Sequence, residues 1–115
     1  MAISEAFQNS ATIGVTEWFL ASNSGTKTDQ TTDGIFQLVI DCNAVANGDE
    51  FRVRLYERIS SAGTTRIAEE WVIANLPSSP LWFTPAVILM HGWEFSLQKI
   101  LGTDRAIPWS IRQVA

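Results

Sequence analysis

The residues best suited to catalysis or metal binding are scarce in this chain, which has one histidine (His91) and one cysteine (Cys42). A serine triad would have to be built around His91, yet no Gly-x-Ser-x-Gly motif for a nucleophilic serine occurs. A zinc site with one His and one Cys would need two or more carboxylates to complete it. His91 precedes Gly92, and we expect it to be a hydrogen-bonded structural residue.

The carboxylates are the other candidates for chemistry. Calcium prefers several oxygen ligands from one loop, and four aspartates raise that option: Asp29, Asp33, Asp41 and Asp49. Their spacing matches no known calcium loop, and Asp near Gly is also what turns require. Glu69 and Glu70 are adjacent on an expected strand, so their side chains should point to opposite faces. We therefore expect no metal, no cofactor and no enzymatic activity.

The charge of the chain argues against nucleic-acid binding. Eight Lys and Arg against twelve Asp and Glu give a formal net charge of −4. The cations are scattered, with no run longer than the alternating Arg52 and Arg54. A nucleic-acid backbone is bound by clustered cations that release condensed counterions, and the sequence has no such cluster. We expect no nucleic-acid partner.

Targeting and membrane-spanning patterns are not evident in the sequence. The start, MAISEAFQNS, lacks a basic region followed by a long apolar run, so we expect no secretory signal. The longest strongly apolar run, residues 86–90, is too short to span a bilayer, and we expect no membrane partner. Cys42 has no second cysteine to pair with and is expected to be a small buried side chain in a reducing compartment.

Alternation of apolar and polar residues predicts β-strands along much of the chain. Residues 50–58 (EFRVRLYER) place Phe51, Val53 and Leu55 on one face and mainly charged residues on the other. This pattern is typical of an antiparallel strand with one buried face and one wet face. Residues 93–98 and 107–111 alternate in the same way, and residues 101–104 predict the loop of a hairpin that joins them.

About seven or eight short strands, separated by turn residues at intervals of roughly ten, predict an all-β fold. We expect residues 13–115 to form one antiparallel β-sandwich or jelly roll, because the chain has the usual size of a single domain. Residues 1–12 stand apart, since Ile3 and Phe7 are four positions apart and allow a short helical turn. This segment is expected either to fray against the sandwich or to be an amino-terminal arm that docks on a neighbouring subunit.

Bulky aromatic residues separate the expected core from an expected interface. Trp93 and Trp109 occupy apolar positions of alternating strands and are expected in the core. Trp18 adjoins Phe19, so one of the two must face away from the other. The three bulky side chains of residues 81–83 (LWF) cannot all lie on one side of a sheet. The segment is therefore expected either to be buried on both sides or to expose an aromatic side chain to a partner. The candidate interface residues are Ile3, Phe7, Trp18, Leu81, Trp82 and Phe83.

Several segments together resemble small virion structural proteins of tailed bacteriophages, of the kind that decorate or cement the capsid. The resemblance spans roughly residues 13–114 and is carried by residues 32–41, 47–49, 51–58, 90–93, 102–105 and 109–112. It is one of general character, and it transfers no functional residue individually.

The resemblance implies a β-sandwich subunit that lies over junctions between major capsid protein subunits and stabilises the shell. It also implies self-association, often as a trimer, and a place on the capsid surface of the virion after synthesis in the host cytoplasm. Two alternatives remain at this stage. The protein could be a tail, neck or baseplate component of the virion, or a carbohydrate-binding module that presents tryptophan side chains to sugar rings.

Overall fold

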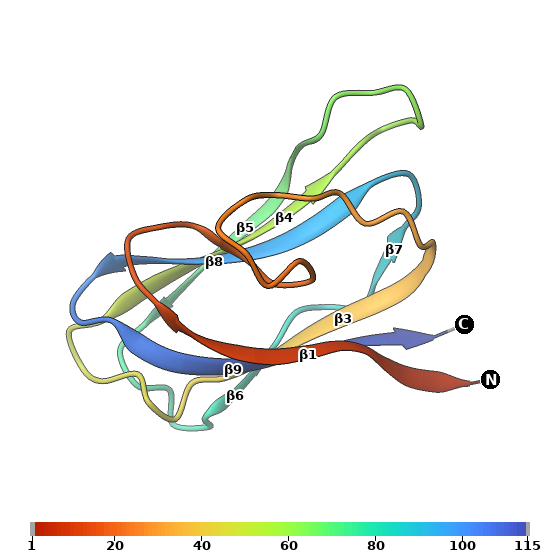
Figure 1. The fold of residues 1–115 in the computed structure, drawn as a ribbon. Helices are drawn as coiled ribbons and strands as arrows, with labels where there is room; N and C mark the ends of the chain where they lie inside the picture. The colour runs from red at the N-terminus through yellow and green to blue at the C-terminus, as the bar shows by residue number, and fades with distance from the viewer. Residues whose placement is uncertain (1, 115) are drawn as a thin grey trace.

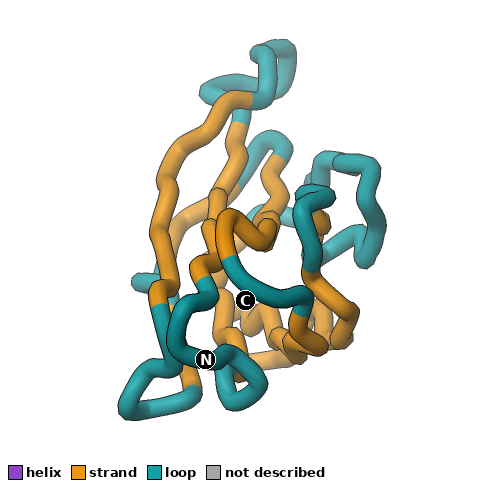
Figure 2. Tube along the Cα trace, turned by 90° about the vertical axis from the view of Figure 1, so that its left-hand side faces the viewer, coloured by secondary structure: helices purple, strands orange, loops and turns teal. Residues whose placement is uncertain are grey.

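A computed structural model describes residues 2–114, in which nine β-strands form two antiparallel sheets (Figure 1). These residues contain no helix, hence none long and apolar enough to cross a membrane, and Figure 2 shows only strands and connecting loops. The strands are β1 (Ile3–Ile13), β2 (Trp18–Phe19), β3 (Gly34–Asp41), β4 (Glu50–Glu57), β5 (Arg66–Ala74), β6 (Leu81–Phe83), β7 (Val87–Leu89), β8 (Trp93–Leu101) and β9 (Arg105–Val114). The prediction of an all-β antiparallel fold is confirmed. The strand count exceeds the expected seven or eight because β2, β6 and β7 have only two or three residues each.

The strands divide into two sheets, named A and B below. Sheet A has the order β1, β9, β3 and β6, and β7 pairs with the other end of β3. Sheet B has the order β2, β8, β4 and β5. Strand β1 is therefore one edge of sheet A, and β6 and β7 share its opposite edge.

The core lies between the sheets and takes one face of each strand. In β4, Phe51, Val53 and Leu55 are 0–3% exposed, as their alternation predicts. Trp93 and Trp109 are buried at 0% and 3% exposure, which confirms their expected place in the core. Their indole N–H groups donate to the backbone carbonyls of Thr32 (2.8 Å) and Leu20 (3.1 Å), so the one polar atom of each ring is satisfied. Cys42 is also buried, as expected.

The expected hairpin between the last two strands is wrong. Strand β8 pairs with β2 and β4 in sheet B, whereas β9 pairs with β1 and β3 in sheet A. The connecting loop instead crosses from one sheet to the other at Gly102, which has φ +94° and packs directly on Asp49. The Asp49 carboxylate accepts hydrogen bonds from the Thr103 N–H (3.0 Å) and from Arg105 Nε (2.8 Å), which holds the crossing in place.

The amino-terminal segment is a strand, so the expected helical turn is wrong. Strand β1 pairs with β9 from Ile3 to Ile13, with one irregularity at Ala6. The backbone hydrogen bonds offered by β9 and the alternating burial of Phe7, Ala11 and Ile13 favour the extended form over a helix. Docking of this segment on a neighbouring subunit stays a prediction.

Candidate functional site

Exposed apolar side chains gather on the outer face of sheet A. Residues that face each other in adjacent strands project to the same side of a sheet. At one end of sheet A, the row Ile3, Val114, Ile35 and Ile88 crosses four strands in register. Along the edge formed by β6, Phe83 lies opposite Val39 and Leu81 lies opposite Asp41. We call the apolar members of this L-shaped surface the apolar patch: Ile3, Ile35, Val39, Leu81, Phe83, Ile88 and Val114.

The exposure of the apolar patch is high for side chains of this type. Ile88 is 74% exposed, Ile3 71%, Leu81 52%, Phe83 46% and Ile35 40%. Val39 is buried at the base of the patch, and Val114 is half-buried. Gln37, opposite Arg112, lies between the row at one end and the β6 edge at the other. A group of exposed apolar residues on one sheet face is typical of a protein–protein contact surface.

The local sequence explains why these residues face outward. In β3, Phe36, Leu38 and Ile40 are buried in the core at 0–1% exposure, so the residues between them must face the other side. Trp82 likewise turns inward, where its ring meets that of Trp71 edge-on at 5.8 Å. The three bulky residues of β6 therefore alternate, which leaves the outer two exposed.

A buried threonine holds the edge of sheet A between β6 and β7. Thr84 is 2% exposed, its N–H donates to the Leu38 carbonyl (2.9 Å), and its Oγ1 accepts from the Leu38 N–H (3.0 Å). Gln37 Nε2 donates to the Thr84 carbonyl (3.0 Å). These bonds replace the strand ladder at the point where Pro85 interrupts it. The apolar patch is consequently presented on a fixed backbone.

A shallow hollow of about 160 Å³ adjoins the apolar patch. It is lined by Val39, Asp41, Leu81, Pro108, Trp109, Ser110 and Arg112. This volume is below the roughly 300 Å³ of typical small-molecule pockets, and it suits one inserted side chain of a partner. Asp41 and Arg112 give the hollow one acidic and one basic group beside its apolar floor.

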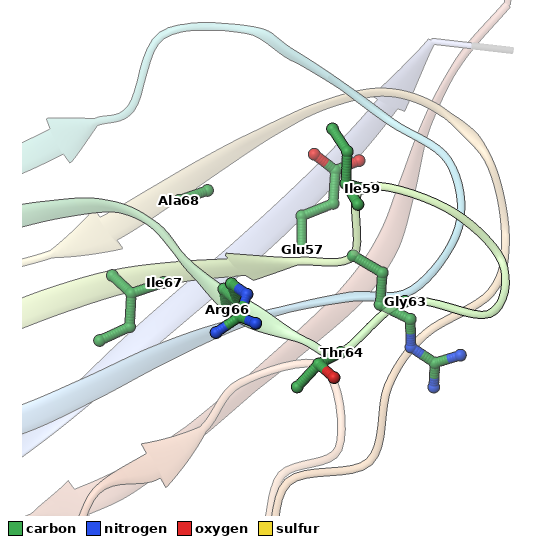
Figure 3. A pocket seen from close by; sticks show the side chains of 8 residues that line it. Glu57, Ile59, Gly63, Thr64, Arg66, Ile67 and Ala68 are labelled. Carbon is green, nitrogen blue, oxygen red and sulfur yellow. The ribbon is translucent and has the colours of Figure 1, made fainter.

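A larger hollow of about 440 Å³ lies in the protruding β4–β5 hairpin (Figure 3). All its lining residues come from the two strands and their loop, among them Ile59, which is 93% exposed, and Ile67, which is 47% exposed. Its acidic group, Glu57, accepts a hydrogen bond from the Met90 N–H (3.1 Å). Neither His91 nor Cys42 lines this hollow. It contains no nucleophile–base pair of the kind that catalysis requires.

The outer face of sheet B is built differently, from polar groups that bind one another. Glu17 accepts hydrogen bonds from the Tyr56 hydroxyl (2.6 Å) and the Ser96 hydroxyl, and its carboxylate lies 3.7 Å from Arg54 Nη1. Burial and the hydrogen bond to Glu17 raise the pKa of Tyr56 above its ordinary value. Glu70 Oε1 lies 3.6 Å from Nε of Arg54 and equally far from Nε of Arg52. We call this group the polar network.

The polar network continues into the loop before β3. Asp29 accepts hydrogen bonds from Arg58 Nη2 (2.7 Å), Thr65 Oγ1 (2.6 Å) and Lys27 Nζ (2.9 Å). Burial alone would raise the pKa of Asp29, but these donors outweigh it and lower the pKa to about 2. Lys27 also lies over the Tyr56 ring, 5.6 Å from its centroid.

Glu94 is a fully buried carboxylate beside this network. Its side chain accepts hydrogen bonds from the N–H groups of Ala21, Ser22 and Phe95 and from the Ser22 hydroxyl, at 2.6–2.9 Å. Burial raises the pKa of Glu94 although these donors act in the opposite direction. Every contact of this carboxylate is internal, so its role is to fasten the loop after β2 to β8.

The structure separates the sequence-derived interface candidates into two groups. Ile3, Leu81 and Phe83 lie on the apolar patch. The other three are half-buried and contact the chain itself. Phe7 meets the Trp93 ring edge-on at 6.0 Å, Trp18 Nε1 donates to Asn23 Oδ1 (3.1 Å), and Trp82 packs on Trp71.

Four members of the apolar patch were not among the sequence-derived candidates, namely Ile35, Val39, Ile88 and Val114. Residues 87–90 form a continuous apolar run, which fits a buried strand as well as a half-exposed one. The alternation of side chains along β3 could have identified Ile35, because successive residues of a strand face opposite sides and Phe36 faces the core.

Within residues 2–114, no group of three or more His, Cys, Asp or Glu side chains lies so that it could hold a metal ion. The four aspartates considered above are dispersed. Asp29 and Asp49 lie in separate hydrogen-bond clusters of sheet B and of the sheet-crossing loop.

Comparison with known proteins shows a similarity of fold. No family model matches the chain, and no curated protein matches it. Among solved structures, the chain is similar to the crystal structure of PirA, with 12% sequence identity and a TM-score of 0.54. The alignment covers 96% of each chain. At this identity the likeness concerns the fold and carries no residue-level correspondence.

Proposed function

We propose that this protein is a virion structural protein of a tailed phage that decorates the capsid, binding over junctions between major capsid protein subunits and stabilising the shell. The observation that supports the proposal best is the apolar patch on the outer face of sheet A. A decoration protein works by burying such a surface and needs no titrating group. The phage context itself comes from the sequence resemblance.

The chemistry of the apolar patch favours a protein partner over a glycan. Sugar-binding sandwiches stack flat aromatic rings on sugar rings, which requires exposed and coplanar aromatics. Here Trp93 and Trp109 are buried, Trp18, Trp71 and Trp82 are half-buried, and the patch is aliphatic apart from Phe83. Aliphatic side chains gain most from a partner that removes them from water, as another protein surface does.

Binding to a shell would stabilise the particle by linkage, because a ligand that binds the assembled state alone shifts the equilibrium toward assembly. The shell repeats each binding position many times, so a patch of modest area is sufficient when neighbouring copies are held together.

The test is co-sedimentation of the purified protein with empty shells assembled from the major capsid protein of the same phage. The double variant Phe83→Ser/Ile88→Ser should lower the bound fraction at least about tenfold, since two anchors of the contact are lost. Val72→Ser is the matched control, because Val72 is 56% exposed but belongs to sheet B.

Equal binding of the double variant and the wild type would overturn the assignment of the apolar patch. Absence of the protein from shells, together with its recovery in purified tails, would replace capsid decoration with a tail, neck or baseplate role. Particles that withstand heat equally well without the protein would contradict the stabilising role.

A further inference from the structure

The sheet edges differ in how they are protected against pairing with another chain. Strand β5 carries Arg66, Glu69 and Glu70 along its nine residues. Strands β6 and β7 have three residues each and are separated by Pro85, and β2 has two residues. Charges, prolines and short length are the devices by which natural sheets blunt their edges. Three edges are protected in this way.

Strand β1 lacks these devices over residues 7–13. It is eleven residues long, and its sequence from Phe7 to Ile13 (FQNSATI) contains no charged residue and no proline. The charged Glu5 and the irregularity at Ala6 lie at one end of this stretch. The stretch is therefore a regular, uncharged and unpaired edge.

The backbone register shows which groups of β1 face outward from the sheet edge. Ser10 lies opposite Pro108 of β9, which has no N–H to give. The Ser10 N–H donates to the Asn9 side chain (2.9 Å). Ser10 and Pro108 therefore form a non-hydrogen-bonded pair of the antiparallel ladder. A residue in such a pair turns both its N–H and its C=O away from its partner strand. By alternation, the free edge presents the backbone groups of Gln8, Ser10 and Thr12.

We propose that a second copy of this chain pairs with this edge, β1 against β1, in antiparallel register about a twofold axis at Ser10. A twofold axis requires an antiparallel pair of identical strands, in which the same surface meets itself. Ser10 then faces its symmetry mate, and Gln8 faces Thr12 of the other copy. These pairs join an amide or hydroxyl to a hydroxyl, and no like charges face each other.

The arrangement has a consequence for the apolar patch. When two copies of sheet A continue one another, their outer faces lie on the same side. The dimer would then present two apolar patches toward a single surface. Bivalent contact raises the apparent affinity for a repetitive shell without any new contact at the patch itself. The dimer contact lies along the β1 edge of sheet A, whereas the shell contact lies on its outer face. The dimer can therefore be absent while the proposed function holds.

The first measurement is light scattering of the full chain after size-exclusion chromatography, over a wide range of concentrations. We expect a mass near twice the 12.7 kDa of one chain at the upper concentrations. Ser10→Lys should lower the dimer association constant at least about tenfold, because two ammonium groups meet at the axis. Thr31→Lys is the matched control: it adds the same charge on an exposed loop residue and should leave the dimer intact.

A second measurement protects the test against misfolding of the variant. Hydrogen exchange of the amides of Gln8, Ser10 and Thr12 should slow as the wild-type concentration rises, because pairing covers them. Ser10→Pro removes the outward N–H without taking a hydrogen bond from β9, and it should abolish this dependence. A monomer or a trimer at all concentrations, or concentration-independent exchange at these amides, would overturn the proposal.

Discussion

The outer faces of the two sheets differ in the side chains that they present to water. On sheet B, polar side chains bind one another and the loop before β3 adds further partners, so many polar groups of this face have partners within the chain. On sheet A, no element within residues 2–114 covers the apolar patch, and Ile3, Ile88, Leu81 and Phe83 remain 46–74% exposed. The outer face of sheet B contributes internal hydrogen bonds, and the outer face of sheet A leaves apolar side chains exposed.

The two faces differ in how much bonding capacity they leave for a partner. Charged residues attract attention first, and this chain concentrates them around Glu17, Asp29 and Glu70. Glu17 and Asp29 each accept hydrogen bonds from donors of the same molecule, so little of their bonding capacity is left for a partner, whereas Glu70 is partly exposed and lies 3.6 Å from its arginines. The aliphatic surface of sheet A is the better candidate for a partner contact. Its side chains are exposed to water, so covering them with a partner would be favourable.

The largest loss of stability is expected from Glu17→Ala in the polar network. The substitution leaves the buried Ser96 hydroxyl and the half-buried Tyr56 hydroxyl without their acceptor, at a cost of about 1–3 kcal/mol for each buried group. We expect the free energy of unfolding to fall by about 3 kcal/mol, measured by urea denaturation. Glu17→Gln keeps an acceptor oxygen and should cost less than half as much. A loss below about 0.5 kcal/mol for Glu17→Ala would show that the polar face is not what stabilises sheet B.

A smaller and pH-dependent loss is expected from Asp29→Asn. The folded-state pKa of Asp29, about 2, is below its ordinary value of 3.8, so its stabilisation is present above pH 3.8 and is lost as the pH falls toward 2. At pH 7 the variant should be less stable by about 2 kcal/mol, and the difference should vanish near pH 2. The check is urea denaturation of both proteins at several pH values.

Asp33→Asn is the control for this series, because Asp33 is an exposed aspartate of the same loop. It should leave the dependence of stability on pH close to that of the wild type. If Asp29→Asn were equally destabilised at pH 2 and pH 7, the carboxylate charge would not be the cause.

The sequence was sufficient for several strands but not for β1 or for which strands pair. The alternation around Phe51 and the positions of Trp93 and Trp109 depend on local period and on the need to bury large side chains, and both are visible in one segment at a time. Whether β8 and β9 share a sheet depends on Gly102 lying against Asp49, a contact between residues 53 positions apart. The sequence of either segment alone does not predict such a long-range contact.

The sequence also predicted only part of the candidate site, namely Ile3, Leu81 and Phe83. The crowding at 81–83 allowed either burial on both sides or an exposed aromatic, because strand geometry forbids all three from one side. The structure exposes Leu81 and Phe83 and turns Trp82 inward. The helical turn allowed for Ile3 and Phe7 was wrong, because both lie in strand β1. The irregularity at Ala6 places Ile3 on the outer face and Phe7 against Trp93. The row that joins Ile3 to Ile88 arises only from register across four strands, which no single segment encodes.

The smallest change in stability is expected from Ile88→Ser on the apolar patch. Ile88 is 74% exposed, so the folded chain gains little from it, and the free energy of unfolding should change by less than about 0.5 kcal/mol. The same substitution should weaken binding to a shell, because in the complex the methyl groups leave water. The two faces then show opposite responses: Glu17→Ala reduces stability, and Ile88→Ser reduces binding alone. A large loss of stability for Ile88→Ser would mean that the patch is needed by the fold, and its availability for a partner would lose its support.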